Sequence, residues 1–293
     1  AEQFQNCFVS WVQTVFQRKD GQVIAIDGKS VRRSHDRANG QEAIHVVSAW
    51  ATVNHLVLGQ QKVADKSNEI TAIPELLRLL EISDCIVTID AMGCQTEIAE
   101  QIVDQGADYL LTVKGNQPHL LEDMTFFFKL AHQNEFRKVE HSYARTVNKG
   151  HGRIETRHCW VISGEEDLQF LRDFDQWKKL RSMVKVTSER QLNGKTTSET
   201  RYYITSLVAD AKALLHAARS HWGVENSLHW VLDVAMGEDD SRIRKKNAPQ
   251  NMAVLRRIAV NLLKQEKTLK RGVKGKRLKA AMNPDYLLKV LSV

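Results

Sequence analysis

Two aspartates each follow a short apolar segment of the chain, and a third acid lies far downstream. Asp27 closes VIAID and Asp90 closes CIVTID, and both segments have the apolar, β-branched composition of buried strands. An ionised carboxylate at the end of such a strand is unfavourable unless a partner neutralises it. Divalent cations are suitable partners, because Mg²⁺ and Mn²⁺ prefer carboxylate oxygens as ligands. Together with Glu225 in HWGVENSLHW, the two aspartates predict a site for metal-assisted phosphodiester chemistry.

Each of these acids also has a purely structural explanation. Aspartate is common at strand ends because its side chain forms turns and caps helices. Glycine-containing turns follow both aspartates, at Gly28 and Gly93, which favours the functional interpretation of the pair. A lone glutamate on a helix is usually a solvated residue, and four other acids close to Glu225 are alternatives for the third position: Asp233, Glu238, Asp239 and Asp240.

The composition is that of an ordinary globular protein. The chain has 293 residues, 42% of them hydrophobic and 26% charged, which suits one large domain or two smaller ones. No apolar stretch has the length of a membrane-spanning helix, and the first residues show no secretory signal, so we expect no membrane partner. The four cysteines show neither a CxxC pair nor metal-ligand spacing, which favours a reducing, cytoplasmic location.

Positive charge is concentrated toward the C-terminus. Residues 241–293 hold 15 Lys or Arg and two acids, a net charge of +13, whereas the rest of the chain has 27 basic and 33 acidic residues, a net of −6. Half of the sixteen residues from Lys264 to Lys279 are basic. Such a segment is typical of proteins that bind a phosphate backbone with salt-dependent affinity. A solvated basic tail or a segment at a membrane surface is the alternative.

The order of predicted elements from residue 22 to 113 is three strands, a helix, a strand, a helix and a strand. Pro74 is predicted to begin the first helix, and Thr96 to cap the second, which stops at Gly106. The predicted strands are 23–27, 44–51, 56–63, 85–90 and 108–113. This order predicts an α/β fold, a mixed sheet flanked by helices, as in ribonuclease H-like proteins. In that fold the first and fourth strands are neighbours, which would bring Asp27 and Asp90 together.

The following part of the chain changes character. In RIETRHCWVI the side chains alternate in the way expected for a half-buried strand. Asn193-Gly194 lies between two β-type segments and is a strong hairpin signal. Helical patterns then return, with Gly223 as a break. We therefore expect four regions: 1–20, the end of an N-terminal helical region; 21–124 plus 206–240, a ribonuclease H-like catalytic domain; 125–205, a β-rich insertion; and 241–293, a basic helical C-terminal segment.

Several strings resemble one known family. Five sequence motifs are similar to those of the H-repeat-associated transposases of bacterial insertion sequences, which are of the DDE class. They are AIDGK, TIDAMGCQ, TVKGNQP, RSHWGVENSLHWVLDV and NMAVLRRIAVNLL. The resemblance covers the chain from about residue 20 onward. It implies a ribonuclease H-like fold and DNA cleavage and strand transfer at element ends with two Mg²⁺ or Mn²⁺ ions. It places Asp27, Asp90 and Glu225 on the catalytic, metal-binding triad.

Two features depart from the family pattern. Members usually carry a further N-terminal helical region, which would precede Ala1. Many related transposases surround the catalytic glutamate with Tyr, Arg and Lys, but here those places hold Ala218, His221 and Leu232. Arg219 is a candidate replacement for the missing arginine.

The resemblance implies DNA as the partner, both element ends and target, and a homodimer on the DNA because transposition joins two ends. Eight basic residues are expected to contact DNA: Lys114, Arg219, Arg242, Arg244, Lys245, Lys246, Lys270 and Arg271. Two alternatives stay open at this point. One is a remnant that binds DNA without catalysis, and the other is a nuclease that hydrolyses DNA without joining it.

Overall fold

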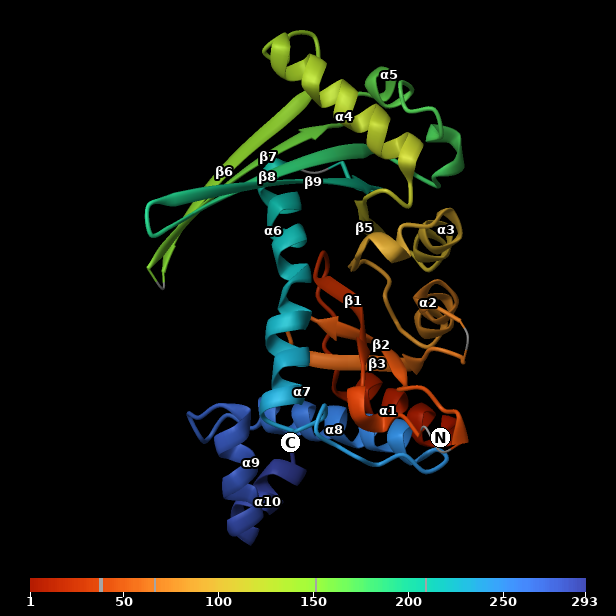
Figure 1. Cartoon of the computed structure of the whole chain (residues 1–293), viewed down its shortest axis with the longest axis vertical. Helices are drawn as coiled ribbons and strands as arrows, with labels where there is room; N and C mark the ends of the chain where they lie inside the picture. The colour runs from red at the N-terminus through yellow and green to blue at the C-terminus, as the bar shows by residue number, and fades with distance from the viewer. Residues whose placement is uncertain (37–38, 66, 151, 209) are drawn as a thin grey trace. The chain divides into compact units, whose positions relative to one another are not determined.

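The computed structural model describes residues 1–36, 39–65, 67–150, 152–208 and 210–293, which form two compact units (Figure 1). Unit 1 comprises Ala1–Glu81 and Ser220–Val293, and unit 2 comprises Ile82–Arg219. Each combines strands with packed helices, so the fold is mixed α/β. Within the described residues, none of the helices combines the length and apolar character needed to cross a bilayer.

The strands of unit 1 form an antiparallel meander in the order β3-β2-β1. They are β1 (Val23–Ser30), β2 (His45–Ala51) and β3 (Leu56–Lys62). The hairpin predicted between the second and third strands is confirmed. The first strand does not end at Asp27 as predicted, because Gly28, Lys29 and Ser30 continue to pair with β2. Asp27 therefore lies within the strand and opposite Ser48.

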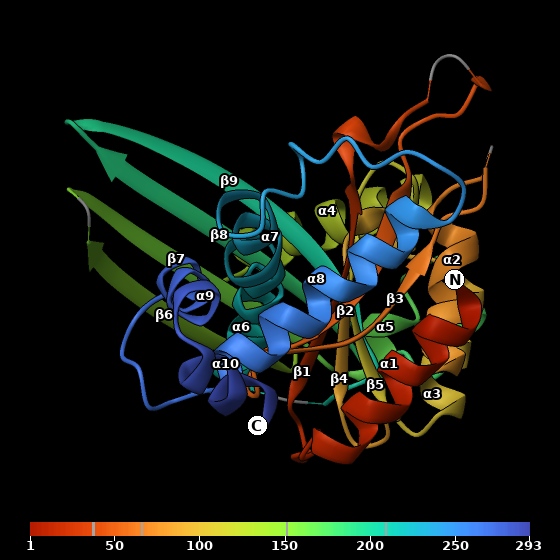
Figure 2. The ribbon, with the colours of Figure 1, turned by 90° about the horizontal axis from the view of Figure 1, so that it is seen from below.

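Helices cover the two faces and one edge of this meander. The face that holds Gly59 contacts Val9 of α1 (Glu2–Val15) and Leu76 of α2 (Glu69–Arg78). The opposite face holds Asp27 and Ser48, and Arg257 of α8 (Ala248–Gln265) donates a hydrogen bond to Ser48. Figure 2 shows α8 running along β3, which it contacts.

One residue of α8 caps the edge strand of the meander. The Asn261 amide accepts a hydrogen bond from Val57 N at 2.8 Å and donates one to Val57 O at 2.9 Å. Asn261 is fully buried. A strand edge exposes unpaired backbone groups that favour aggregation, and a side-chain amide that satisfies both of them removes this problem locally.

Two helix starts differ from the predictions. α2 begins at Glu69 rather than at Pro74, because the Asn68 side chain accepts a hydrogen bond from Ile70 N and caps the helix earlier. Pro74 then lies inside the helix. The helix α3 (Thr96–Asp104) begins at Thr96 with Gln95, not Thr96, at the cap position. Its predicted stop is confirmed, since Gly106 has a φ of +73° just after the end.

Unit 2 joins a short parallel pair of strands to four long antiparallel strands, in the order β4-β5-β9-β8-β7-β6. The pair is β4 (Ile86–Ile89) and β5 (Asp108–Val113), and β5 pairs antiparallel with β9. The long strands are β6 (His141–Gly150), β7 (Arg153–Ile162), β8 (Ser182–Leu192) and β9 (Lys195–Thr205). Asn193 and Gly194 have φ values of +49° and +76°, so the expected hairpin turn joins β8 to β9.

Helices pack on both sides of the four long strands. α4 (Pro118–Gln133) contacts one face, where His132 meets the ring of Trp160. On the other face, Ala211 N at the start of α6 (Ala211–His221) donates to Ser142 Oγ of β6 at 2.9 Å. Figure 1 shows α4 crossing these strands. The strand β6 is not predicted from the sequence, because its residues are mostly polar and show little alternation of apolar and polar types.

After α8, the basic C-terminal segment of unit 1 continues as two short helices, α9 (Val273–Met282) and α10 (Pro284–Leu291). They pack on the end of α8 through a small apolar cluster of Leu263, Ala280, Tyr286 and Val290. The helical character expected for residues after 241 is therefore present in this part of the chain.

A buried carboxylate holds this segment together. Glu266 accepts hydrogen bonds from Thr268 N at 2.6 Å and from the Tyr286 hydroxyl at 2.7 Å, and the Thr268 hydroxyl also donates to it. Lys276 lies beside it, with its Nζ 3.7 Å from the carboxylate. The hydrogen bond from the Thr268 hydroxyl is the largest cause that lowers the pKa of Glu266 to about 2.

We predict that Glu266→Gln lowers the free energy of unfolding by about 2 kcal/mol at pH 7, since hydrogen bonds to a charged acceptor are lost. A carboxyl whose pKa is lower in the folded state stabilises the fold above the unfolded pKa of about 4.5. The difference from wild type should therefore shrink as the pH falls from about 4.5 toward about 2. Urea unfolding between pH 7 and pH 3 measures it, with the exposed Asp285→Asn as control. A pH-independent difference would contradict the assignment.

Candidate functional site

The three predicted acids are divided between the two units. Asp27 lies in β1 and Glu225 begins a π-helical turn, η5 (Glu225–His229), so both belong to unit 1. Asp90 belongs to unit 2 and directly follows β4. Among the described residues, no three His, Cys, Asp or Glu side chains are grouped closely enough to hold a metal ion. The common site for the three acids is therefore still a prediction.

The carboxylate of Asp27 faces an imidazole in unit 1. His229 Nδ1 lies 3.4 Å from Asp27 Oδ2, and only 12% of the His229 side chain is exposed. Burial, reinforced by the positive charges of Arg257 and Lys29, lowers the pKa of His229 to about 3. The ring is therefore neutral near pH 7 and faces Asp27 as a polar group without a charge.

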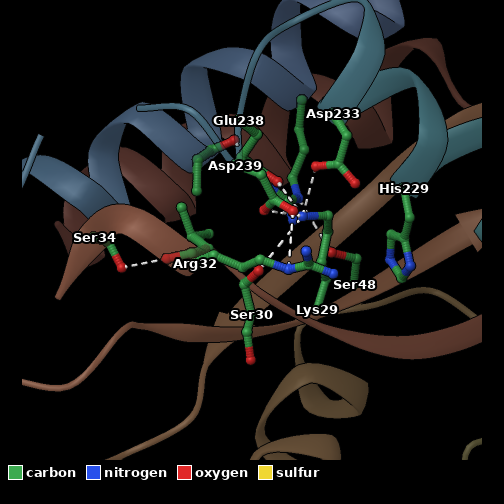
Figure 3. A network of polar contacts seen from close by, with 12 residues as sticks. Lys29, Ser30, Arg32, Ser34, Ser48, His229, Asp233, Glu238 and Asp239 are labelled. Carbon is green, nitrogen blue, oxygen red and sulfur yellow. Dashed lines mark hydrogen bonds and ion pairs between the residues drawn. The ribbon is translucent and has the colours of Figure 1, made fainter. Parts of the chain in front are cut away.

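Lys29 is the centre of a cluster of acids next to this pair (Figure 3). It lies two residues after Asp27 in β1, so both side chains are on the same face of the strand. Lys29 Nζ lies 2.7 Å from Asp233 Oδ1 and 2.7 Å from Asp239 Oδ1, and 3.8 Å from Glu238 Oε2. Its side chain is only 9% exposed. The ammonium group of Lys29 thus forms ion pairs that link β1 to the residues that follow η5.

A second buried cation extends the cluster to α8. Arg257 Nη1 lies 3.1 Å from Glu238 Oε1, and both side chains are fully buried. The same guanidinium donates to Ser48 Oγ at 3.1 Å through Nε, and to its own helix at Ala253 O. Buried ion pairs require such additional hydrogen bonds because desolvation of the charges is costly. The cluster therefore joins β1, β2, the segment around Glu238 and α8.

This cluster bears on the choice of the third acid. Asp233, Glu238 and Asp239 each face Lys29 or Arg257, and Asp240 lies 3.4 Å from Arg33. A lysine held among these acids occupies the position where a cation would bind. Among the described residues no ion pair involves Glu225, whose side chain is exposed. Three of the four alternatives are thus paired with Lys29 or Arg257, whereas Asp240 pairs with the exposed Arg33.

Glu225 lies on an unusual turn of helix. The helical chain from α6 changes to the π-helical turn η5 and then to α7 (Trp230–Val234). π-Helical turns are rare and occur often at functional sites, because they rotate side chains out of the regular helical register. Gly223, predicted as a break, lies just before this turn, and a Cβ there would lie 3.8 Å from Trp50 Nε1.

Gly28 beside Asp27 leaves room for two side chains that pack against it. A Cβ at this position would lie 2.5 Å from His45 Nε2, and closer still to the Glu69 carboxylate. Those two side chains form a pair at 2.6 Å on the face of β1 opposite Asp27. The glycine in AIDGK therefore gives room to a pair that links β2 to the start of α2.

Asp90 caps the turn that follows β4. Its Oδ1 accepts a hydrogen bond from Met92 N at 3.1 Å, at the start of the short helix η3 (Ala91–Gly93). This is the structural role that aspartates commonly have at such positions. It orients the carboxylate at the C-terminal end of β4 and does not by itself establish a catalytic role.

The loop after β5 holds this turn in place. Asn116 Nδ2 donates to Ala91 O at 2.6 Å, and Gln117 Nε2 donates to Cys94 O at 2.8 Å. Lys114 in the same loop is exposed. Two residues of the motif KGNQP thus stabilise the turn that follows Asp90. The side chain of Lys114 is exposed and accessible to a phosphate.

The other predicted DNA contacts have different surroundings. Arg219 belongs to unit 2 and donates to Asn148 Oδ1 of β6 at 3.0 Å, so it is already committed to a protein partner there. Arg244 Nε donates to Arg33 O at 3.1 Å. The remaining residues have exposed side chains: Arg242, Lys245, Lys246, Lys270 and Arg271.

Three features of this site are not predicted from the sequence: Lys29, His229 as a neighbour of Asp27, and the Arg257–Glu238 pair. The two-residue spacing of Asp27 and Lys29 within a strand is a signal that could have indicated a shared face. No comparable signal exists for Arg257, which appears as one of several basic residues on a helix. Its burial follows from the packing of α8 on β2 and β3.

Comparison with known proteins places the chain among transposases. A family model described as "Transposase DDE domain" matches residues 18–262, which include Asp27, Asp90 and Glu225. The protein named "Putative transposase YncI" of Escherichia coli O157:H7 is 45% identical over 293 residues, which cover 99% of this chain and 74% of that protein. "H repeat-associated putative transposase YhhI" of Escherichia coli K12 is 44% identical over 294 residues, covering 99% and 76%. The resemblance found in the motifs is confirmed.

We predict that Lys29→Met lowers the free energy of unfolding by about 3 kcal/mol, because it removes a nearly buried cation from among three acids, of which Glu238 is fully buried. The matched control is Arg32→Met, whose side chain is 80% exposed and also pairs with Asp239, at 3.2 Å. An exposed pair of this kind contributes less than about 1 kcal/mol. Urea unfolding of both variants measures the difference. Equal effects of the two substitutions would show that the cluster is not the main source of stability here.

Proposed function

Because the chain belongs to the DDE transposase family, we propose that it cleaves DNA at the ends of an insertion sequence and joins them to target DNA. The observation that supports this most is the family match over the residues that contain all three predicted acids. In this proposal Asp27, Asp90 and Glu225 form the catalytic set of a ribonuclease H-like domain.

The proposed cofactor is a pair of Mg²⁺ or Mn²⁺ ions. DDE transposases generally use divalent metals, and three carboxylates are a suitable set of oxygen donors for these ions. Bound there, the ions would activate the attacking hydroxyl and stabilise the leaving oxygen. We propose Asp27 as the shared ligand, with Asp90 and Glu225 each holding one ion.

The neighbouring residues would prepare these ligands. Neutral His229 faces Asp27 without adding positive charge, and Lys29 pairs with competing acids, Asp233 among them. The cap to Met92 N orients Asp90. Preorganised ligands reduce the loss of freedom on metal binding, which is why such supporting contacts matter.

The proposed partner is DNA, bound through exposed cations. Lys114 lies in the loop that holds the Asp90 turn, and Lys270 and Arg271 precede α9 in the basic segment. Contacts of this kind are to phosphates and so add affinity without sequence preference. The proposed set of DNA-contacting residues also includes Arg219, Arg242, Arg244, Lys245 and Lys246. A homodimer on the DNA, in the cytoplasm, completes the proposal.

The first test is metal-dependent nicking of a supercoiled plasmid that carries the DNA flanking the gene. We expect nicking with Mn²⁺ or Mg²⁺, and at least a 100-fold loss in Asp27→Asn, Asp90→Asn and Glu225→Gln. Binding to the same DNA in EDTA should change less than about threefold. Equal losses of binding and cleavage would contradict the assigned roles.

Asp90→Ala is a useful comparison with Asp90→Asn. Asparagine is as good a cap as aspartate, whereas alanine costs about 1 kcal/mol at such positions. Activity should be lost in both variants, but stability only in the alanine variant. Products joined to target DNA distinguish a transposase from a nuclease, and salt-sensitive binding without any nicking indicates a catalytically inactive remnant.

A further inference from the structure

The four long strands of unit 2 carry a group of aromatic side chains on one face that the proposed catalysis does not use. Tyr143 of β6 pairs across the sheet with Trp160 of β7, which pairs with Lys185 of β8. In the adjacent row, Arg145 pairs with His158. Paired residues of neighbouring strands point to the same side, so these five share one face.

The rings of this group contact one another. The centroids of Tyr143 and Trp160 are 5.4 Å apart, and His158 and Trp160 are stacked at 5.7 Å with an interplanar angle of 15°. Tyr143 and His158 are also stacked, and the tyrosine hydroxyl lies 2.7 Å from His158 Nδ1. Mutual contact holds the rings in fixed orientations on a rigid sheet.

Part of this group is accessible. α4 covers one end of the same face, where His132 contacts Trp160 and Phe128 contacts Tyr202. Beyond α4, Tyr143 is 50% exposed, and the side chains of Trp160 and His158 are partly exposed. A half-exposed tyrosine within a stack of rings leaves one aromatic surface open to a ligand.

The charge around these rings is positive. Lys185 Nζ lies 5.4 Å from the centroid of Trp160, and Arg145, two residues after Tyr143 on the same face of β6, is exposed. The acidic Glu189 of β8 pairs with Thr156, two rows of paired residues away from the row that holds Tyr143 and Trp160. Rings bordered by cations suit a ligand that has both flat π-faces and negative charges.

We propose that Tyr143, His158 and Trp160, with Lys185 and Arg145, form a binding platform for unpaired nucleotides of a DNA strand. Bases stack on the rings and phosphates pair with the two cations, as aromatic side chains on sheets do in single-strand recognition. Duplex DNA hides the faces of its bases, so the platform selects unpaired nucleotides. This activity needs neither a metal nor the acidic residues.

The test measures binding of a fluorescein-labelled 20-nucleotide thymidine strand by anisotropy, with the full chain in EDTA. Tyr143→Leu should weaken binding by roughly 5- to 150-fold, the range for loss of one stacked base. Tyr143→Phe keeps the ring and should bind as wild type. Phe126→Leu is the matched control, because Phe126 is an exposed aromatic of α4 at 52% exposure outside this group.

Three further results decide the outcome. Lys185→Ala should reduce the salt dependence of single-strand binding by about 0.7 in the log–log slope, as expected for one phosphate contact. Binding to a duplex of the same length should be unchanged in Tyr143→Leu. Light-induced coupling of a 5-iodouracil strand should occur within residues 141–162. Circular dichroism and thermal melting confirm that each variant is folded.

Any one of three results would overturn the proposed platform. They are unchanged single-strand binding in Tyr143→Leu, equal losses of affinity for single strand and duplex in that variant, and coupling confined to residues 264–279. None of these results depends on nicking, so the platform can fail while the proposed transposase activity stands, and the reverse also holds.

Discussion

The ion cluster around Lys29 is the interaction on which unit 1 depends. One ammonium group, 9% exposed, lies among carboxylates that follow the helix with Glu225, while its own strand carries Asp27. Arg257 extends the cluster to α8 and to Ser48 of β2. Charges buried to this degree are stable only when they are paired, so the register between strand and helix is fixed by electrostatics as well as by apolar packing. Unit 1 thereby sets the surroundings of two of the three acids.

Unit 2 positions its acid by a different device. Asp90 accepts a hydrogen bond from Met92 N, and the turn that follows it is held by the side-chain amides of Asn116 and Gln117. The hydrogen bonds of Asn116 and Gln117 join neutral groups. The strings TIDAMGCQ and KGNQP, far apart in the chain, are therefore parts of one local structure.

Much of this could be predicted from the sequence, for identifiable reasons. The strands with continuous apolar runs and the Asn193-Gly194 hairpin were predictable because periodicity and turn chemistry are local. The polar strand β6 was missed, as was the early start of α2 at the Asn68 cap. Of the candidate site, Asp27 and Asp90 are predicted from their positions after apolar segments, and Glu225 from the resemblance to the transposase family. Lys29, His229 and Arg257 were not, because their significance arises only when distant segments pack together.

We propose that Asp27, Asp90 and Glu225 hold the same metal ions. Substitution of Fe²⁺ for Mg²⁺, followed by ascorbate and peroxide, generates hydroxyl radicals that cut the polypeptide near the bound iron. We expect cuts near all three residues, suppressed by excess Mg²⁺ and lost together in Asp90→Asn. Cuts confined to one of these segments, or cuts that persist in Asp90→Asn, would contradict a shared site.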